Sequence, residues 1–214
     1  MAVFQQIYFD LDGTLCDSYP GIERGFMDAL RQLGRTDITE EDLKKLIGIP
    51  LTTSLYTFFP DDDATVNRAV ELFREYYRTQ GMFESVLYPG IDALLATLSE
   101  TAQLYVATAK PTVYAKQMLE HHKVLQYFTD VRGVTLEGGD NFTKAGAIGD
   151  SYAGGMAIMV GDRKQDIDAG KAAGIRSLGV LYGYGQEEEI RNATPTHIAA
   201  NVAELTQILS GKGV

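Results

Sequence analysis

The sequence predicts an α/β fold, a doubly wound parallel sheet whose first strand is followed by an inserted all-helical segment. From residue 88 onward, short apolar runs alternate with helical patterns, which is typical of parallel strands joined by right-handed crossover helices. Residues 18–82 show only helical patterns, and without them about 150 residues remain, a normal size for one domain. We therefore expect a core of residues 1–17 and 83–214 and a helical domain of residues 18–82.

The expected sheet begins with an apolar strand before the insertion. The later apolar runs are short and bounded by polar residues or glycine, as buried strands are. The expected strands are 5–9, 104–107, 131–134, 157–160 and 177–181. The expected helices of the core are 91–98, one that contains Val113, Met118 and Leu119, then 143–152 and 166–173.

The inserted segment carries start and stop signals of several helices. Pro20 suits the first turn of a helix, and Gly34 suits its end. Thr39, followed by acidic residues, is a favourable N-terminus, whereas Gly48 and Pro50 interrupt the pattern. The expected helices are 20–33, 39–47, 52–58 and 61–77.

Composition narrows the functional classes. The formal net charge of −10 argues against a nucleic-acid partner, because binding to phosphate backbones requires clustered lysine and arginine. The single cysteine, Cys16, excludes an internal disulfide and is expected to fill apolar space. Residues 1–6 lack a basic leader pattern, and no apolar run approaches the roughly 18 residues that span a membrane. We therefore expect a soluble cytoplasmic protein with no membrane partner.

The most informative motif stands at the end of the first expected strand, where Asp10, Asp12, Gly13 and Thr14 follow the apolar run. A carboxylate at the edge of a core requires a cation, a proton or water, so this pair is a candidate functional site. A hairpin turn at Asp12-Gly13 and an ordinary solvated loop remain open as alternatives. A calcium-binding loop is excluded, because Gly21 stands where such a loop needs glutamate.

Polar residues also follow later strands. Thr108 follows the strand 104–107, Asp162 follows the strand 157–160, and Asp166 opens the next helix, while Lys144 lies between them near the start of a helix. Each alone has a structural explanation: a loop hydroxyl, a helix cap or a solvated lysine. Because ligands of open parallel sheets bind at the carboxyl ends of the strands, their joint order predicts one site.

These motifs, in this order, resemble those of the haloacid dehalogenase-like hydrolase superfamily. The matching residues are Asp10-Leu-Asp12-Gly-Thr14-Leu, Thr108, Lys144 and Gly161-Asp162-x-x-x-Asp166. The likeness covers the whole chain, and the pattern is most similar to the phosphoglycolate phosphatase-like branch. It implies a Rossmann-like core, with the insertion forming a helical cap.

The resemblance implies a chemistry for the carboxylates. Asp10 would attack phosphorus to form an aspartyl-phosphate, and Asp12 would act first as general acid and then as general base. Mg²⁺ would be held by Asp10, the backbone carbonyl of Asp12, and Asp162, a set of hard oxygen ligands. The resemblance also argues against a dehalogenase or a phosphonate hydrolase, because those branches have Asp-x-Tyr and Asp-x-Ala where this chain has Asp10-Leu-Asp12.

The resemblance also implies contacts to the phosphoryl group. Thr108 would hydrogen-bond to it, Lys144 would add positive charge, and Asp166 would orient that lysine or a metal-bound water. Lys110 is a rival for the lysine role, and Lys144 is preferred because it lies between the strand motifs. Gly48 is a candidate substrate contact in a segment that resembles the cap loop, with a simple helix break as an equal alternative.

The expected function is a Mg²⁺-dependent phosphatase of a small-metabolite phosphate monoester, similar to phosphoglycolate. A nucleoside 5′-monophosphatase, a pyrophosphatase and a sugar phosphomutase are alternatives on the same scaffold, and a phosphate-binding regulatory protein is the alternative outside the enzymes. The expected partner is a small phosphorylated metabolite, and the expected state is a monomer or a homodimer. Gly183-Tyr184-Gly185, after the last main strand, is a candidate border of the site, but a plain loop is the preferred expectation.

Overall fold

The computed structural model describes all residues except 1–2, 45, 47–48, 50, 137–140 and 212–214. The chain forms two compact units. The first, the core unit, consists of Met1–Asp17 and Val86–Val214, and the second, the helical unit, consists of Ser18–Ser85. Within the described residues, no helix combines the length and the apolar character needed to span a membrane.

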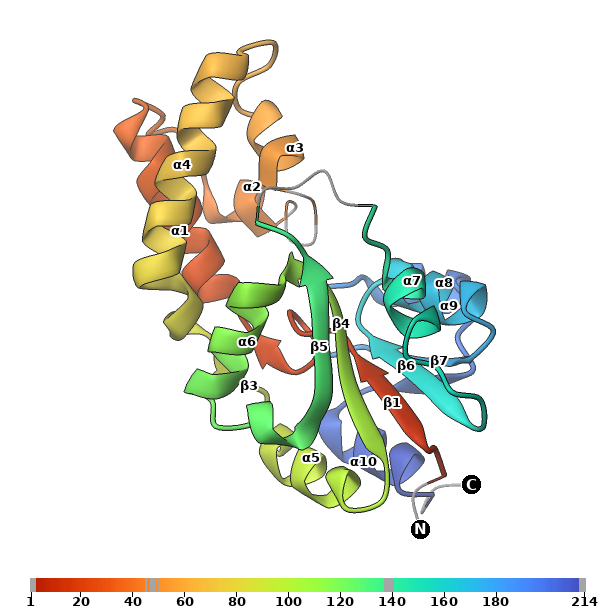
Figure 1. Cartoon of the computed structure of the whole chain (residues 1–214). Helices are drawn as coiled ribbons and strands as arrows, with labels where there is room; N and C mark the ends of the chain where they lie inside the picture. Colours follow the sequence, from red (N-terminus) through yellow and green to blue (C-terminus); the bar gives the residue numbers. More distant parts are fainter. Residues whose placement is uncertain (1–2, 45, 47–48, 50, 137–140, 212–214) are drawn as a thin grey trace. The chain divides into compact units, whose positions relative to one another are not determined.

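A parallel sheet forms the centre of the core unit, which confirms the predicted fold class (Figure 1). Among the described residues it has six strands in the order β5-β4-β1-β6-β7-β8, all paired in parallel. The strands are β1 (Gln6–Phe9), β4 (Gln103–Pro111), β5 (Phe128–Val134), β6 (Ala157–Gly161), β7 (Arg176–Val180) and β8 (His197–Ala199). A separate antiparallel pair consists of β2 (Cys16–Asp17) and β3 (Val86–Leu87).

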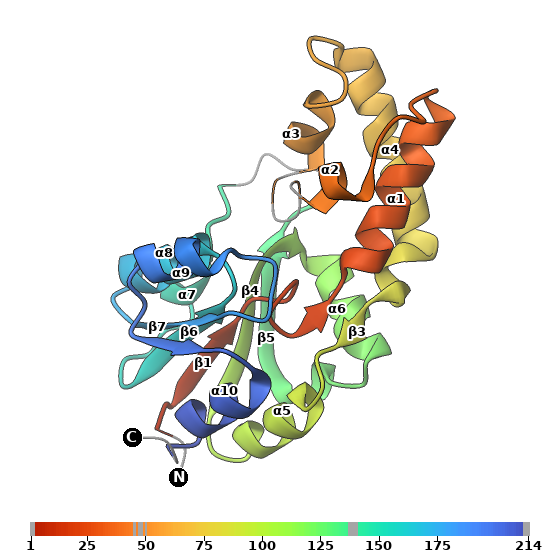
Figure 2. The ribbon, with the colours of Figure 1, turned by 180° about the vertical axis from the view of Figure 1, so that it is seen from behind.

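Helices cover both faces of the sheet (Figures 1 and 2). The helices α7, α8 and α9 lie on one face, where α8 contacts α7, α9, β6 and β7, whereas α5, α6 and α10 lie on the other. Their bounds are α5 (Ile91–Ser99), α6 (Thr112–His121), α7 (Lys144–Gly149), α8 (Lys164–Ala172), α9 (Glu187–Asn192) and α10 (Val202–Leu209), with a 3₁₀ turn, η2, at Leu125–Tyr127. This double cover explains why the central strands are apolar at successive positions.

Buried side chains lie on both faces of the sheet, because successive side chains of a strand point to opposite sides. On the face covered by α7 and α8, the rings of Tyr8 and Tyr105 stack with centroids 4.8 Å apart and pack with Ile148. The next residue of β1, Phe9, meets the ring of Phe128 edge-on at 6.4 Å. Both faces of β1 are therefore buried. This burial fixes the orientation of the strand and hence the position of the residues that follow it.

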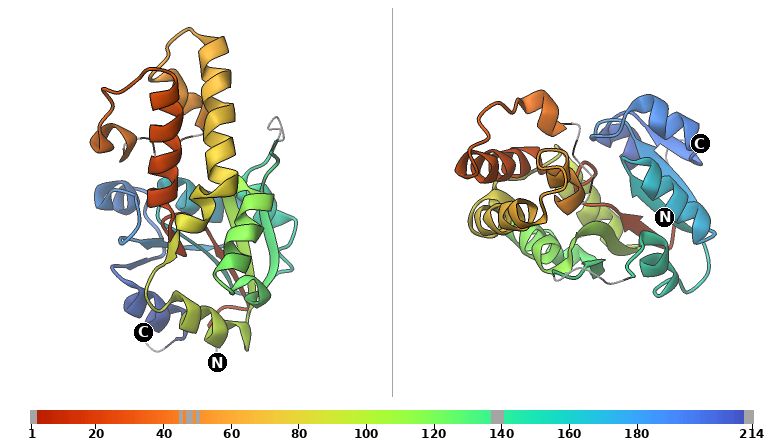
Figure 3. Two further views of the ribbon diagram at one scale, coloured as in Figure 1. Left: turned by 90° about the vertical axis from the view of Figure 1, so that its left-hand side faces the viewer. Right: turned by 90° about the horizontal axis from the view of Figure 1, so that it is seen from above.

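The helical unit is built around two long helices, α1 and α4, which run side by side (Figure 3). Phe26 of α1 packs against Phe73 of α4 with ring centroids 5.0 Å apart. Gly25 permits this approach, since a Cβ there would lie 2.9 Å from the Phe73 ring. Asp62 caps α4 by accepting a hydrogen bond from the backbone of Thr65. The elements are α1 (Tyr19–Gln32), α2 (Glu40–Lys44), α3 (Leu51–Tyr56), α4 (Asp63–Thr79) and the 3₁₀ turn η1 (Gly81–Glu84).

Candidate active site

Three neighbouring strands bring the predicted site residues to one edge of the sheet. β1 lies between β4 and β6. Asp10 directly follows β1, Asp162 directly follows β6, and Thr108 lies near the end of β4. The backbone N–H of Asp10 donates to the carbonyl of Val160 at 2.9 Å, which extends the β1–β6 ladder to the first carboxylate. The carboxyl ends of parallel strands thus gather these polar groups, as the topology predicts.

The loop after β1 is held in a tight coil by its own backbone. The carbonyl of Leu11 accepts hydrogen bonds from Leu15 N at 3.0 Å and Cys16 N at 3.2 Å, and Gly13 N donates to the Cys16 carbonyl at 2.9 Å. Gly13 adopts φ of +79°, and a Cβ on it would lie only 2.3 Å from Asp162 Oδ2. Glycine is therefore required both by the backbone conformation and by the close approach of the carboxylate.

The carboxylates of Asp10, Asp162 and Asp166 converge in the interior, with one oxygen of each within 4.8 Å of the others. Asp10 is 7% exposed, and the other two are fully buried. Lys144 Nζ bridges two of them, 2.8 Å from Asp10 Oδ2 and 2.5 Å from Asp166 Oδ1. Asp166 Oδ2 also accepts a hydrogen bond from Arg163 N at 3.0 Å. The helix begins at Lys164 and not at Asp166 as expected, so Asp166 caps α8 from its third residue and also lies in the site.

This cluster has an excess of negative charge, because three carboxylates face one ammonium group. Burial, together with the carboxylates of Asp10 and Asp166, raises the pKa of Asp162 to about 7. Burial lowers the pKa of Lys144, but the same two carboxylates outweigh it and hold that pKa above its ordinary value. Burial also raises the pKa of Asp166, against the opposing effect of Lys144. A cation bound beside these groups would relieve the excess.

The cluster fits a hard divalent cation. Asp10 Oδ1 is buried and accepts no hydrogen bond within the described part of the chain, which is costly for a carboxylate oxygen. Two uncompensated negative charges on oxygen ligands are suited to a divalent ion of the magnesium or calcium type. Asp166 is less available, because the Lys144 ammonium already compensates its charge, whereas the two donors to Asp162, Tyr184 N and the Thr14 hydroxyl, are neutral. Asp10 and Asp162 are therefore the side chains best placed for a metal.

Asp12 is held by a different lysine. Lys110 Nζ lies 2.9 Å from Asp12 Oδ2, and the exposed fractions of the two side chains are 6% and 22%. The backbone N–H of Lys110 donates to the Oγ1 of the buried Thr108 at 3.2 Å. Both lysines considered from the sequence thus lie in the site, Lys144 against Asp10 and Lys110 against Asp12.

A segment after β7 closes over Asp162, so the expectation of a plain loop at 183–185 is wrong. The backbone N–H of Tyr184 donates to Asp162 Oδ2 at 2.8 Å, and the Thr14 hydroxyl donates to Oδ1 at 3.1 Å. A Cβ on Gly183 would lie 2.4 Å from Asp162 Cβ, and one on Gly185 would lie 1.8 Å from the Asp162 carbonyl. Two glycines around an aromatic residue after a strand were the only signal of this contact, and many ordinary loops share it.

Two further expectations concern Gly48 and Cys16. Gly48, the candidate substrate contact, lies outside the described residues. Cys16 is fully buried, and burial raises the pKa of its thiol well above the ordinary value, so it is a poor nucleophile. The structure therefore agrees with its expected role as an apolar filler.

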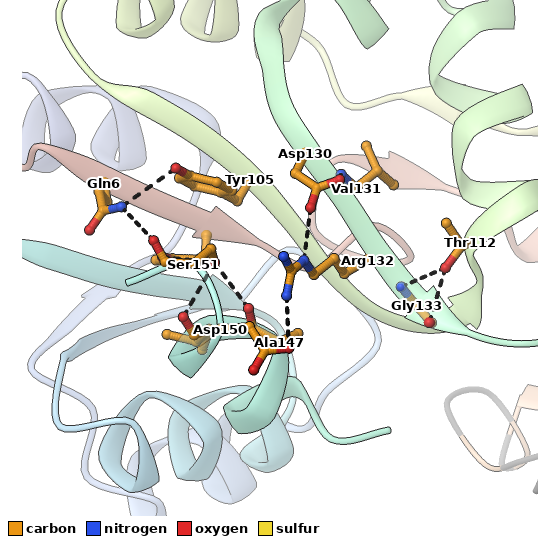
Figure 4. Close-up of polar contacts among 12 residues, drawn as sticks. Gln6, Tyr105, Thr112, Asp130, Val131, Arg132, Gly133, Ala147, Asp150 and Ser151 are labelled. Atoms are coloured by element: carbon orange, nitrogen blue, oxygen red, sulfur yellow. Dashed lines mark hydrogen bonds and ion pairs between the residues drawn. The ribbon is translucent and has the colours of Figure 1, made fainter. Parts of the chain in front are cut away.

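A cavity of about 470 Å³ lies beside this site, between β5 and α7. Its polar lining includes Thr112, Arg132 and Asp150, and it contains none of the four site carboxylates. The Arg132 guanidinium donates to Asp130 at 2.8 Å and to Asp150 at 2.9 Å (Figure 4). Among the described lining residues the arginine is therefore already balanced by two carboxylates, so this cavity is a weaker candidate for a phosphate site than the cluster around Asp10.

Comparison with known proteins places this geometry in context. Residues 7–180 match the family model described as haloacid dehalogenase-like hydrolase. A 5′-nucleotidase from Pseudomonas aeruginosa is 36% identical, with 96% of each chain covered. A phosphoglycolate phosphatase from Vibrio parahaemolyticus is 31% identical, with 95% of each chain covered. The crystal structure of a Clostridium difficile protein, provisionally assigned as a phosphatase, has a TM-score of 0.88 at 37% identity and covers 96% of this chain and 98% of its own.

Proposed function

We propose that this chain, which belongs to the haloacid dehalogenase-like hydrolase family, is a Mg²⁺-dependent phosphatase that hydrolyses a small-metabolite phosphate monoester through an aspartyl-phosphate. The family expected from the motifs is confirmed, and the expected enzyme class, a phosphoric monoester hydrolase, agrees with the relatives. The observation that carries the finer proposal is Asp10, a buried carboxylate with one oxygen on Lys144 and the other without a hydrogen bond in the described chain.

Asp10 is the proposed nucleophile. Lys144 pairs with its Oδ2, and Oδ1 accepts no hydrogen bond in the described chain; one of these oxygens would form the bond to phosphorus and the other would face the metal. As that bond forms, the bond from phosphorus to the leaving oxygen breaks, and Asp12 gives its proton to the leaving oxygen. Water then attacks phosphorus, Asp12 takes a proton from it, and the Asp10 carboxylate is released with inorganic phosphate.

The remaining residues would bind the phosphoryl group and set its surroundings. We propose that the Thr108 hydroxyl donates a hydrogen bond to a phosphoryl oxygen and that the Lys144 ammonium compensates its charge. Asp166 would orient this lysine, since its Oδ1 lies 2.5 Å from Lys144 Nζ. Preorganised donors of this kind stabilise the charge that develops on the equatorial oxygens during phosphoryl transfer.

Mg²⁺ is the proposed cation of the site. Asp10, Asp162 and the backbone carbonyl of Asp12 would hold it, a set of hard oxygen ligands that suits this ion. When bound, it would supply positive charge that offsets the repulsion between the carboxylates and the anionic substrate. The excess negative charge of the cluster around Asp162 supports this assignment.

The relatives and the insertion support a proposal for the substrate class. We propose a small phosphate monoester similar to phosphoglycolate, and we propose that the helical unit acts as a cap that selects it. A nucleoside 5′-monophosphate is the second candidate, because a relative with 36% identity is a 5′-nucleotidase.

A panel of phosphate monoesters tests the proposal by measuring phosphate release with Mg²⁺ and with EDTA. The panel contains 2-phosphoglycolate, nucleoside 5′-monophosphates and sugar phosphates, and pyrophosphate is added as a separate class. We expect release from a monoester that requires Mg²⁺ and is lost in the Asp10→Asn variant. Release that persists in Asp10→Asn would refute the nucleophile, and full activity after removal of divalent ions would refute the metal.

The same panel separates the alternatives. A phosphomutase must keep water from the aspartyl-phosphate, so isomerisation of a sugar phosphate without net phosphate release would identify one. A phosphate-binding regulatory protein would bind members of the panel and release phosphate from none of them in the presence of Mg²⁺.

A further inference from the structure

The proposed reaction assigns no role to Lys110, the second buried lysine of the site. We infer that Lys110 is a positioning residue for Asp12, holding its carboxylate where it can exchange a proton with the leaving oxygen. The inference rests on the proposed function. It is based on the ion pair of 2.9 Å between Lys110 Nζ and Asp12 Oδ2, in which the lysine side chain is 6% exposed.

The fold fixes the backbone of Lys110 through a bulge in β4. Ala107 pairs with Arg132 and Pro111 with Val134, so β4 advances further than β5 over the same stretch. The residues between Ala107 and Pro111 form the bulge, and Lys110 is one of them. Bulges of this kind redirect side chains and are common beside active sites. A regular strand would not place the Lys110 backbone at this point.

Contacts on both sides hold the bulge in place. The Lys110 carbonyl lies so close to Gly133 that a Cβ on the glycine would approach it to 2.0 Å. The Thr112 hydroxyl accepts a hydrogen bond from Gly133 N at 2.9 Å and donates to the Gly133 carbonyl at 3.0 Å (Figure 4). On the other side, Lys110 N donates to Thr108 Oγ1 at 3.2 Å. These contacts therefore hold the backbone from which the Lys110 side chain extends.

Stability alone does not account for a lysine in this position. Burying an ammonium group costs several kcal/mol, and apolar residues of similar volume are commonly as stabilising as a buried ion pair. What the pair supplies is geometry, because a general acid must lie within hydrogen-bond reach of its target. Lys144 holds Asp10 and Lys110 holds Asp12, so the two carboxylates of the motif are held by separate cations.

Leaving-group dependence tests the inference, because general-acid catalysis matters most for a strongly basic leaving oxygen. The wild type and Lys110→Met are compared on an alkyl phosphate, 2-phosphoglycolate or the best alkyl ester of the panel, and on p-nitrophenyl phosphate, whose leaving group needs little protonation. We expect kcat/KM to fall by about a hundredfold or more for the alkyl ester and by less than about tenfold for p-nitrophenyl phosphate. Lys110→Arg, which keeps the charge, should recover part of the loss.

Matched controls separate this role from a structural one. Lys116, an exposed lysine of α6, provides the control variant Lys116→Met, which should retain wild-type rates on both esters. Equal losses on the two esters, or no loss on either, would overturn the inference. If Lys110→Met does not fold, Lys110→Arg must itself show the larger loss on the alkyl ester. Wild-type protein that hydrolyses neither ester would instead refute the proposed function, and the inference with it.

Discussion

Replacing Asp162 by asparagine should stabilise the metal-free protein, although it removes a proposed metal ligand. Without a cation, the carboxylates of Asp10, Asp162 and Asp166 share one ammonium group. Asparagine has nearly the same shape and no charge. Its carbonyl oxygen can accept the hydrogen bond from Tyr184 N, and its amide can donate to the Thr14 hydroxyl, so both hydrogen bonds of Asp162 have a counterpart.

The size of the effect follows from the pKa of Asp162, which burial and the neighbouring carboxylates raise from 3.8 to about 7. The pKa of Asp162 is higher in the folded state than in the unfolded state. The stability that the bound proton contributes is therefore complete below pH 3.8 and is lost as the pH rises through about 7. Relative to a neutral side chain, the aspartate therefore costs the folded state about 2 kcal/mol at pH 5.5, where it must keep its proton, and about 4 kcal/mol at pH 8, where it is ionised. Asp162→Asn should remove this cost.

Urea unfolding in EDTA, followed by circular dichroism, measures the difference at the two pH values. Asp168→Asn, at an exposed aspartate of α8 that pairs with Lys164, is the matched control and should change stability by less than about 0.5 kcal/mol. Millimolar Mg²⁺ should abolish the advantage of Asp162→Asn, because the ion stabilises the wild type by binding its folded state. A variant that is no more stable than the wild type at pH 8 in EDTA, or whose gain does not grow with pH, would refute the reasoning.

Two further predictions concern packing around the site. Gly161→Ala should destabilise the protein by about 1–3 kcal/mol, because its Cβ would lie 2.1 Å from the Asp166 carboxylate carbon. Thermal unfolding measures this, and Gly149→Ala, with no atom within 4 Å of the added Cβ, should leave stability unchanged or slightly raised. Equal melting temperatures for the two variants would contradict it. Cys16, buried and with its pKa raised by burial, should react with a thiol reagent only at the rate of unfolding, and rapid labelling of the native protein would show that the site opens locally.

The parallel core was predictable because its central strands are covered on both faces. β1 and β6 are buried at every position, so apart from Gln6 and the terminal Gly161 each appears in the sequence as a continuous apolar run. β5 is only partly buried, and it begins at Phe128, three residues before the expected start at Val131. A partly buried strand has a weaker apolar pattern in the sequence, so its start is predicted less accurately.

The end of β4 shows where local patterns stop being informative. The apolar run predicted a strand that ends at Ala107, whereas β4 continues through a bulge to Pro111. Thr108 and Lys110 look like loop residues because they are polar. Both belong to β4, and the Lys110 ammonium pairs there with Asp12 instead of packing among apolar side chains.

By itself, the sequence determined which strand ends carry the acids, and hence that Asp10 and Asp162 meet at one edge of a parallel sheet. This follows because parallel strands place their carboxyl ends together whatever the details of packing. Only the tertiary structure decided that Lys144 bridges Asp10 and Asp166, that Lys110 holds Asp12, and that the segment after β7 closes over Asp162. Those contacts join residues far apart in the chain, and they depend on a register shift and on close glycine approaches that no local pattern records.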